Sequence, residues 1–333
     1  MSSIPASESR SGLKTISFVI PCYCSEKTIR SVVDEIRGEV RKKKDEYDYE
    51  IILVNDYSRD GTLREIEKLS AEDHKIVGVD FPRNFGQASA QMAGFHEVRG
   101  DYVISLDDDG QMPIESVFDL IAKLDEGYDL AFGKYDEIKQ KWYRNIGSWV
   151  NVKMAEKLVG QPKNVRVTSF WAGKRYIINE ILKYDGAYPY IGGLLLRVTR
   201  NITSVPVKHR ERQFGTSNYT FTKLIALWMN GFTAFSILPL RFATFSGLTC
   251  AFLGFIFGLA MIIRKLVNPD IMMGYASIVT ILMFIGGMIM MMLGIIGEYV
   301  GRTYISINKA PQFVVKHKWD HRDNSKQTSS KGE

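Results

Sequence analysis

The sequence predicts an α/β domain with a mostly parallel sheet, followed by a pair of membrane-spanning helices. Three observations support this prediction. Short apolar segments alternate with amphipathic segments between Ile16 and Phe132, polar clusters follow three of the apolar segments, and residues 242–300 are almost free of charge. A chain of 333 residues is long enough for one α/β domain of ordinary size and an additional membrane segment.

The alternating segments predict five strands and four helices. Apolar, β-branched runs indicate strands, and apolar residues at helical spacing indicate amphipathic helices. The predicted strands are Ile16–Ile20, Glu50–Val54, Ile76–Val79, Asp101–Leu106 and Asp129–Phe132, and the predicted helices are Thr28–Lys44, Thr62–Leu69, Gly86–Val98 and Ile114–Leu124. We expect the first strand to stop at Pro21. Strands that alternate with helices form a mostly parallel sheet covered on both faces.

Polar clusters follow the first, second and fourth predicted strands. They are Pro21–Glu26, Asn55–Asp60 and Asp107–Gln111. In open α/β sheets, ligands bind outside the carboxyl ends of the strands. We therefore expect the three clusters to meet at one rim of the sheet and to form the functional site there.

The third cluster reads Asp107-Asp108-Asp109-Gly110-Gln111. Consecutive carboxylates repel one another unless a cation lies among them, and hard oxygen ligands suit Mg²⁺ or Mn²⁺. Such a cation would stabilise a departing diphosphate. The alternative is a solvated acidic turn before the next helix, but the expected position at the rim favours a metal site.

The second cluster combines a candidate ligand with candidate helix caps. Asp56 is suited to accept hydrogen bonds from a nucleobase or a ribose. Ser58 and Asp60 are equally suited to cap the helix that follows. We interpret Asp60 mainly as a cap and Asp56 mainly as a ligand.

Two segments near the C-terminus, Phe242–Ile263 and Met272–Ile296, contain no charged residue. A helix of about 20 apolar residues crosses the hydrocarbon core of a bilayer. The alternative is a pair of buried core helices, but such helices are usually shorter and carry a polar stripe. We therefore predict a transmembrane hairpin.

The charges around this hairpin predict its orientation. Basic residues near membrane ends mark the cytoplasmic side. They are Arg241 before the first span and Arg302, Lys309, Lys316 and Lys318 after the second. The N-terminal domain and the C-terminal tail should therefore both be cytoplasmic, although Arg264 and Lys265 in the connecting loop weaken the asymmetry.

The remaining segments complete the predicted organisation. A polar tail (1–14) with no signal peptide precedes a catalytic domain (15–220), and an aromatic-rich segment (221–240) is suited to the membrane interface or, alternatively, to packing on that domain. The hairpin (241–300) contains small-xxx-small patterns that allow close helix packing; such patterns are common in membrane helices and are only weak evidence for a homo-oligomer. A basic tail (301–333) follows.

Composition excludes several other classes. The net charge of +6 is mild, and we expect no nucleic-acid partner. The three cysteines fit a reducing compartment, and Cys22-x-Cys24 has no accompanying Cys or His cluster that would complete a metal site. No G-x-G-x-x-G motif follows the first strand, which argues against a dinucleotide-dependent dehydrogenase.

The motifs, taken in order, resemble those of glycosyltransferase family 2. This resemblance is carried by Pro21-Cys22-Tyr23, Asn55–Thr62 and Asp107-x-Asp109-x-Gln111. Two further motifs, Arg83-Asn84-Phe85-Gly86 and Arg212-x-x-Gly215-x-Ser217-Asn218-Tyr219, are similar to those of the polyprenyl-phosphate branch, which includes dolichyl-phosphate mannose synthases and bacterial undecaprenyl-phosphate sugar transferases. The paired spans match the bacterial members, and the resemblance covers roughly Ile16 to Val315.

The resemblance implies a GT-A type domain and a metal-dependent hexosyltransferase of the cell membrane. Such an enzyme moves a sugar, with inversion, from a nucleoside-diphosphate sugar to undecaprenyl phosphate and serves wall or surface glycan biosynthesis. Uridine is the expected base, and guanosine remains open.

The resemblance also implies roles for individual residues. The nucleotide pocket is lined by Pro21 and Tyr23, and Asp56 contacts the base. The metal and the diphosphate are held by Asp107, Asp109 and Gln111. The acceptor phosphate is bound by Arg212, Ser217 and Arg144. Of these residues, Asp109 and Arg212 are the expected catalytic ones.

Three positions depart from the pattern of the family. Cys24 stands where relatives usually carry Asn, Asn55 replaces the first Asp of an Asp-Asp pair, and Asn218 replaces a frequent Lys. These departures bear on nucleotide preference and acceptor recognition.

Two other functions agree less well with the sequence. A processive polysaccharide synthase usually carries a Gln-x-x-Arg-Trp motif and more spans, and this sequence has neither. An inactive nucleotide-binding membrane scaffold is disfavoured by the intact Asp107, Asp109, Gln111 and Arg212.

Overall fold

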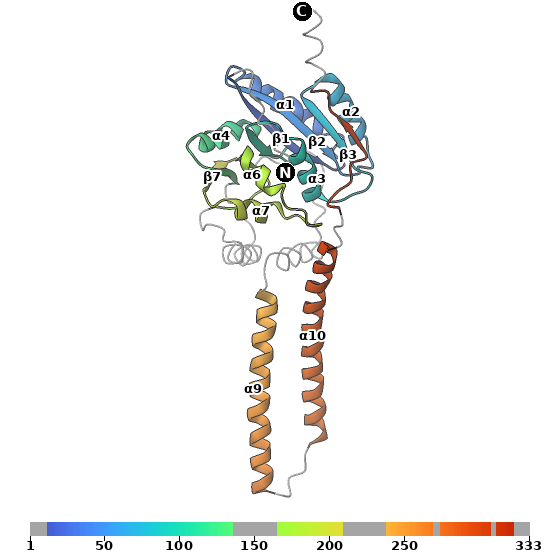
Figure 1. Cartoon of the computed structure of the whole chain (residues 1–333), viewed down its shortest axis with the longest axis vertical. Coiled ribbons are helices and arrows are strands. Elements are labelled where there is room, and N and C mark those ends of the chain that lie inside the picture. The colour runs from blue at the N-terminus through green and yellow to red at the C-terminus, as the bar shows by residue number, and fades with distance from the viewer. Residues whose placement is uncertain (1–11, 136–164, 209–237, 269–273, 308–310, 323–333) are drawn as a thin grey trace, which may run out of the picture. The chain divides into compact units, whose positions relative to one another are not determined.

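A computed structural model of the chain describes residues 12–135, 165–208, 238–268, 274–307 and 311–322 (Figure 1). The chain forms two compact units. The first contains Met1–Asn218 together with Ala310–Glu333, and the second contains Tyr219–Lys309. The first unit is thus built from two segments of sequence that flank the second.

The first unit is built on a sheet that has eight strands within the described residues, in the order β7-β5-β6-β4-β1-β2-β3-β8. The strands are β1 (Lys14–Cys22), β2 (Tyr47–Asn55), β3 (Ile76–Asp80), β4 (Tyr102–Ser105), β5 (Leu130–Tyr135), β6 (Trp171–Lys174), β7 (Ile202–Val207) and β8 (His317–Trp319). The helices are α1 (Ile29–Arg41), α2 (Thr62–Glu72), α3 (Gln87–Glu97), α4 (Val117–Asp125), α6 (Arg175–Ile181) and α7 (Ile191–Val198), and a 3₁₀ turn at Ile114–Ser116 precedes α4.

The centre of the sheet is parallel, as predicted. Strand β1 pairs in parallel with both β2 and β4, and β2 pairs in parallel with β3. The sheet becomes mixed toward its edges, because β6 runs antiparallel to β4 and β5, and β8 runs antiparallel to β3. The predicted α/β domain is therefore confirmed, with antiparallel additions that the sequence pattern did not reveal.

Side chains that alternate along the strands face two separate cores. In β1, Phe18 packs in the core formed with α1, α2 and α4, whereas Val19 packs in the core formed with α3, α6 and α7. The helical spacing of apolar residues in α1 places Ile29, Val33 and Ile36 against the first core. The sheet is therefore covered on both faces, which is what a continuously apolar strand requires.

We expected the first strand to stop at Pro21, but β1 continues to Cys22. Pro21 lies opposite Val54 in the parallel register. The strand continues because proline lacks only the N–H donor and keeps its carbonyl group, and the carbonyl of Cys22 accepts the N–H of Asp56 at 3.0 Å. The first polar cluster therefore begins within β1, and its residues from Tyr23 onward form the loop after the strand.

Residues 311–322, which we call the C-terminal strap, return to the sheet of the first unit. Within the strap, β8 pairs with β3, and Phe313 stacks on Phe81. Arg322 forms an ion pair with Glu50 at 2.6 Å, and the two side chains are only 9% and 6% exposed. We predicted a basic tail here and no strand, because three residues are too few to show an alternation of apolar and polar side chains.

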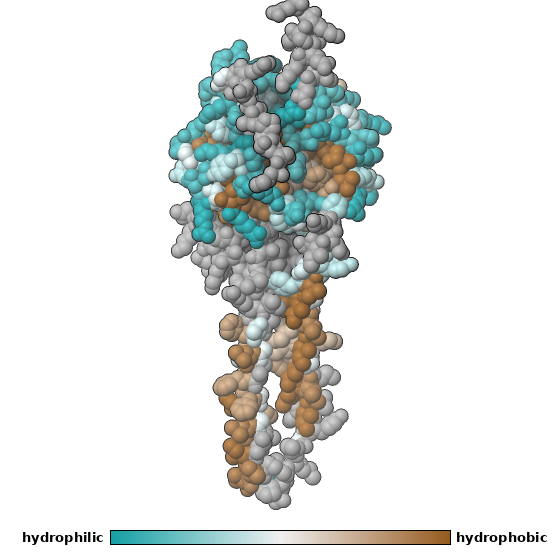
Figure 2. All heavy atoms as spheres, viewed as in Figure 1, coloured by the Kyte–Doolittle hydropathy of each residue, from teal (hydrophilic) through white to brown (hydrophobic). Residues whose placement is uncertain are grey.

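The second unit consists, within the described residues, of the long helices α9 (Leu238–Val267) and α10 (Tyr275–Ile307). Figure 2 shows apolar side chains along both helices. The stretch Phe284–Gly301 is long and apolar enough to cross a membrane and none of it is buried, while Thr244–Ala260 is a shorter apolar stretch. Exposed apolar area costs about 25 cal/mol per Å² in water, so this surface needs an apolar covering. Apart from the first residues of α9, the predicted interfacial segment (221–240) lies outside the described residues.

We predict that the strap loses stability in acid through Asp320. Hydrogen bonds from Arg322 lower the pKa of Asp320 to about 2, so its contribution is present above the ordinary Asp pKa of about 4 and is lost as the pH falls through about 2. Asp320→Asn should lower the free energy of unfolding by about 2 kcal/mol at pH 7 and have little effect near pH 2. Urea unfolding in detergent micelles measures both values.

The control for this measurement is Asp45→Asn, because Asp45 is exposed in the turn between α1 and β2. This variant should match the unsubstituted protein at both pH values. An Asp320→Asn deficit of equal size at both pH values would contradict the prediction.

Candidate active site

The three polar clusters meet at the carboxyl end of the central strands. The N–H of Tyr23 donates to Asp108 Oδ2 at 2.9 Å, and the N–H of Cys24 donates to Ser58 Oγ at 3.0 Å. The N–H of Ser25 donates to the hydroxyl of Thr62 at 2.8 Å. These bonds join the loop after β1 to the loops after β2 and β4, as we predicted for polar clusters at the carboxyl ends of the strands.

Two residues of these loops adopt left-handed backbone conformations. Cys24 has φ +55° and Tyr57 has φ +59°. Non-glycine residues rarely adopt such angles, and Asn does so more readily than most. The position of Cys24 therefore has a backbone reason to carry Asn in relatives, and its replacement leaves the turn in place.

Two aromatic rings at the rim are accessible to a ligand. Tyr23 is 53% exposed and Tyr57 is 48% exposed. Exposed aromatic faces in a binding site can stack against a planar ring such as a nucleobase. Tyr23 was predicted to line such a pocket, and Tyr57 is an addition that the structure provides.

Asp56 is buried and holds the loop that contains the Arg83–Gly86 motif. One carboxylate oxygen accepts the N–H of Phe85 at 2.7 Å, and the other accepts the N–H of Gly86 at 2.9 Å. Burial raises the pKa of Asp56, and the two N–H donors oppose the rise. Its predicted contact with a nucleobase would use the remaining lone pairs of the same oxygens and stays a prediction.

Asn55, the last residue of β2, bridges two neighbouring residues. Its amide nitrogen donates to Asp80 Oδ1 at 2.7 Å, and its amide oxygen accepts the N–H of Ser58 at 3.2 Å. Asn55 and Asp80 are both buried. An Asp at position 55 would place two carboxylates against each other in a dry environment, whereas an amide satisfies both neighbours.

Asp107 is held from two sides by residues that the sequence analysis did not single out. Its Oδ1 accepts a hydrogen bond from Gln87 at 2.8 Å, and its Oδ2 accepts one from Ser169 at 2.8 Å. Burial raises the pKa of Asp107 to about 6, and the charges of Asp109 and Asp108 add to the rise. The orientation of Asp107 therefore depends on α3 and on the segment before β6.

The other members of the acidic triplet have different surroundings. Asp108 accepts the N–H of Tyr23 and so ties two loops together, a structural role that the sequence did not indicate. Asp109 accepts the N–H of Gln111 at 3.1 Å. Gly110, which lies between Asp109 and Gln111, has φ +71°, an angle that glycine adopts without strain. The turn thus places Asp109 beside Asp107, close enough for their charges to interact.

The donor chemistry of Asp107, Asp109 and Gln111 fits a hard divalent cation. All three side chains offer oxygen atoms, which Mg²⁺ and Mn²⁺ prefer, and the like charges on the two carboxylates would be relieved by a cation. Within the described part of the chain, no group of three or more His, Cys, Asp or Glu side chains is arranged to hold a metal. Three side-chain oxygen ligands would leave coordination positions on such a cation for water or for a bound molecule.

The residues predicted to meet an acceptor are not part of the described structure. Arg144, Arg212 and Ser217 all lie outside the described residues. Their roles stay predictions. The described site thus contains the predicted donor side only.

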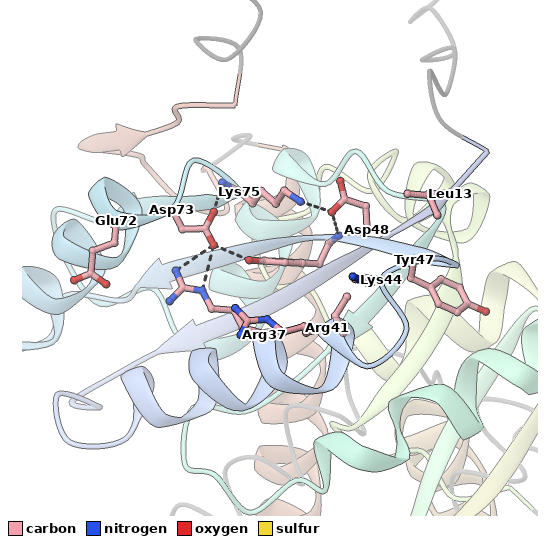
Figure 3. Close-up of a pocket in the computed structure, with 11 residues that line it drawn as sticks. Leu13, Arg37, Arg41, Lys44, Tyr47, Asp48, Glu72, Asp73 and Lys75 are labelled. Atoms are coloured by element: carbon pink, nitrogen blue, oxygen red, sulfur yellow. Dashed lines mark hydrogen bonds and ion pairs between the residues drawn. The ribbon is translucent and has the colours of Figure 1, made fainter. Parts of the chain in front are cut away.

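The described part of the first unit also contains a cavity of about 750 Å³, remote from the polar clusters (Figure 3). It is lined by the end of α1 and by residues where β2 and β3 begin. There Arg37 pairs with Asp73 at 3.1 Å, and the hydroxyl of Tyr49 donates to Asp73 at 2.7 Å. Strands β2 and β3 begin at this end and run toward the rim, so the cavity belongs to the opposite end of the sheet.

Comparison with known proteins identifies two family matches. Residues 17–182 match the model for glycosyl transferase family 2, and residues 238–303 match the GtrB C-terminal hairpin. The first match contains all three polar clusters of the site. The second contains most of α9 and α10.

Two curated relatives are similar over nearly the whole chain. The undecaprenyl-phosphate 4-deoxy-4-formamido-L-arabinose transferase of Proteus mirabilis (strain HI4320) is 32% identical over 91% of this chain and 93% of the relative. The prophage bactoprenol glucosyl transferase homolog of Escherichia coli (strain K12) is 32% identical over 90% of this chain and 98% of the relative. Among solved structures, glucosyl-3-phosphoglycerate synthase from Mycobacterium tuberculosis aligns with a TM-score of 0.48 and 22% identity, covering 63% of this chain and 74% of that chain.

We predict that Asn55 and Asp80 are coupled. Asn55→Asp should lower the free energy of unfolding by about 2 kcal/mol or more, because a buried carboxylate pair replaces a hydrogen bond. The double variant Asn55→Asp with Asp80→Asn reverses the pair and should recover most of the loss. Thermal unfolding of the purified protein in detergent measures the three variants.

The single variant Asp80→Asn serves as the control, because an amide pair keeps the hydrogen bond. It should cost less than Asn55→Asp. Losses that simply add in the double variant would show that the two side chains are not coupled.

Proposed function

Because the chain belongs to glycosyl transferase family 2, we propose that it transfers a sugar from a nucleoside-diphosphate sugar to a polyprenyl phosphate, giving a polyprenyl-phosphate sugar. The first unit has the GT-A type α/β fold of that family. One observation carries the proposal: the similarity to undecaprenyl-phosphate and bactoprenol sugar transferases runs through both the site and the hairpin. The product would serve surface glycan biosynthesis.

The donor binds at the rim formed by the three clusters. Pro21 and Tyr23 line the pocket for the base, with Asp56 beneath it, and the exposed ring of Tyr57 supports an aromatic partner there. Asp107 lies on the diphosphate side. We propose uridine as the base, with guanosine as the alternative that a direct comparison of donors distinguishes.

Asp107, Asp109 and Gln111 would hold Mg²⁺ or Mn²⁺, with diphosphate oxygens as further ligands. When bound, the ion acts as a Lewis acid that stabilises the leaving diphosphate. Gln87 and Ser169 keep the carboxylate of Asp107 in one orientation, and a fixed carboxylate does not have to reorganise during the reaction. The all-oxygen donor set supports this assignment.

The acceptor phosphate attacks the anomeric carbon directly. A phosphate oxygen forms the new bond to this carbon as the bond from the carbon to the diphosphate oxygen breaks, and the nucleoside diphosphate leaves, so the configuration inverts. A phosphate monoester is already anionic at neutral pH and needs little help from a general base. Arg212 binds the phosphate through its planar guanidinium group, with Ser217 and Arg144 beside it.

The hairpin explains how the enzyme reaches its acceptor. Each buried CH₂ stabilises a lipid chain in the bilayer by about 0.8 kcal/mol, so a polyprenyl phosphate stays in the membrane. Helices α9 and α10 would cross the cell membrane as two spans. The catalytic domain and the C-terminal tail would then both be cytoplasmic, and residues 221–240 would lie at the interface.

The function is tested by a donor screen with the full chain. Purified protein in vesicles that contain undecaprenyl phosphate is given single nucleotide-sugars with Mg²⁺ or Mn²⁺, and lipids are analysed by mass. We expect a lipid that carries one sugar, and loss of the product when EDTA is added. No glycolipid with any donor, or a polymer in place of a single sugar, would overturn the proposal.

We predict that Asp109→Ala reduces kcat by at least about a hundredfold, the scale of one lost electrostatic group in an active site. The matched control is Asp119→Ala, because Asp119 is exposed on α4 outside the site. Initial rates of nucleoside diphosphate release with the lipid acceptor measure both variants. Near-normal turnover in Asp109→Ala would remove Asp109 from the proposed metal site.

A further inference from the structure

The C-terminal strap packs against β3 and Phe81, which adjoin the loops of the candidate donor site. The strap begins four residues after α10 ends at Ile307, and it belongs to the first unit. Its partners include β3 and Phe81, the residue that follows β3. The segment that follows the hairpin in sequence is thus structurally part of the catalytic unit.

Three aromatic rings connect the strap to the Arg83–Gly86 loop. Phe313 stacks on Phe81 with ring centroids 5.6 Å apart and an angle of 12° between the planes. Phe81, which is fully buried, meets Phe85 edge to face with centroids 5.4 Å apart. Because the N–H of Phe85 donates to Asp56, a displaced Phe85 would disturb the carboxylate that the base is expected to meet.

A second connection runs through the backbone of the strap. The N–H of Lys316 donates to the carbonyl of Asp80 at 2.8 Å, and His317 then lies opposite Asp80 in the antiparallel register. Asp80 in turn accepts a hydrogen bond from Asn55, the last residue of β2, and Asp56 follows Asn55 directly. The strap therefore connects to the donor loop through two neighbouring residues, Asp80 and Phe81.

The far end of the strap is anchored firmly. Arg322 donates to Glu50 Oε2 at 2.6 Å and to the carbonyl of Glu97 at 2.8 Å. Gln312 at the near end donates to the carbonyl of Tyr184 at 2.8 Å. Anchors at both ends keep Phe313 and Lys316 pressed against their partners.

We infer that the strap is a positioning element for the nucleotide-sugar site and that Phe313 is its main positioning residue. This inference rests on the proposed function for the identity of the donor. Phe313 does not touch the reacting atoms; it keeps Phe81 and Phe85 in place, and Phe85 keeps the Asp56 carboxylate aligned. Loss of Phe313 should therefore weaken donor binding and leave the chemical step largely intact.

The first experiment measures backbone hydrogen exchange in the full chain in detergent micelles, without any substrate. Phe313→Ala should raise the exchange rates of the Phe85 and Gly86 amides by about tenfold, the scale of one lost aromatic pair. The matched control is Val314→Ala, because Val314 is the next residue and is exposed. It should exchange like the unsubstituted protein, and Phe313→Leu should recover part of the protection.

The second experiment measures donor affinity and turnover. With the donor found by the screen, Phe313→Ala should raise KM for the nucleotide-sugar by about tenfold and change kcat by less than about threefold. Titration with UDP and with GDP in the presence of Mg²⁺ should show a parallel loss of nucleotide affinity. Val314→Ala should leave KM unchanged.

Separate outcomes decide the inference. Unchanged exchange at Phe85 and Gly86 in Phe313→Ala, or an equal rise throughout the sheet, would overturn it. If Phe313→Ala does not fold, Lys316→Pro removes the N–H donated to Asp80 and must show the same local rise in exchange. A chain that transfers no sugar to any lipid phosphate would defeat the proposed function, yet the exchange and nucleotide titrations would still test the strap.

Discussion

The parallel pairing of β1 with both β2 and β4 is the constraint on which the site depends. Parallel neighbours end at the same edge of a sheet, so the loops after these strands meet although they are far apart in the chain. The continuation of β1 through Pro21 to Cys22 brings Tyr23 within hydrogen-bonding distance of Asp108. Tyr23 and Asp108 thus mark the point where the loops of the candidate site meet.

Buried polar groups then determine the shape of the loops. A buried carboxylate or amide without partners is costly, and here each one accepts or donates bonds that fix a neighbouring segment. Among the buried groups, Asp56 holds the loop before α3 and Asn55 joins Asp80 to Ser58. The half-buried Asp107 is held in the same way by Gln87 and Ser169. The same bonds that satisfy these groups keep the site in one conformation.

The chain order of this protein separates the two segments of its catalytic unit by a membrane hairpin. The strap closes the β3 edge of the sheet, which would otherwise present unpaired backbone groups. Removal of Arg322 would take away the ion-pair partner of Glu50, a buried carboxylate. The strap therefore belongs to the same unit as the N-terminal segment, although α9 and α10 separate the two in sequence.

The sequence by itself determined the alternating strands and helices, the three clusters at strand ends and the apolar helices, because local periodicity and long apolar runs are visible in a single chain. It also marked Asp107, Asp109 and Asp56 as chemically unusual. Only the tertiary structure decided that Gln87 and Ser169 orient Asp107, that Asp56 holds the Arg83–Gly86 loop, and that the basic tail contains an edge strand. These features depend on partners far apart in sequence and on a strand too short to show a pattern, so no local signal could reveal them.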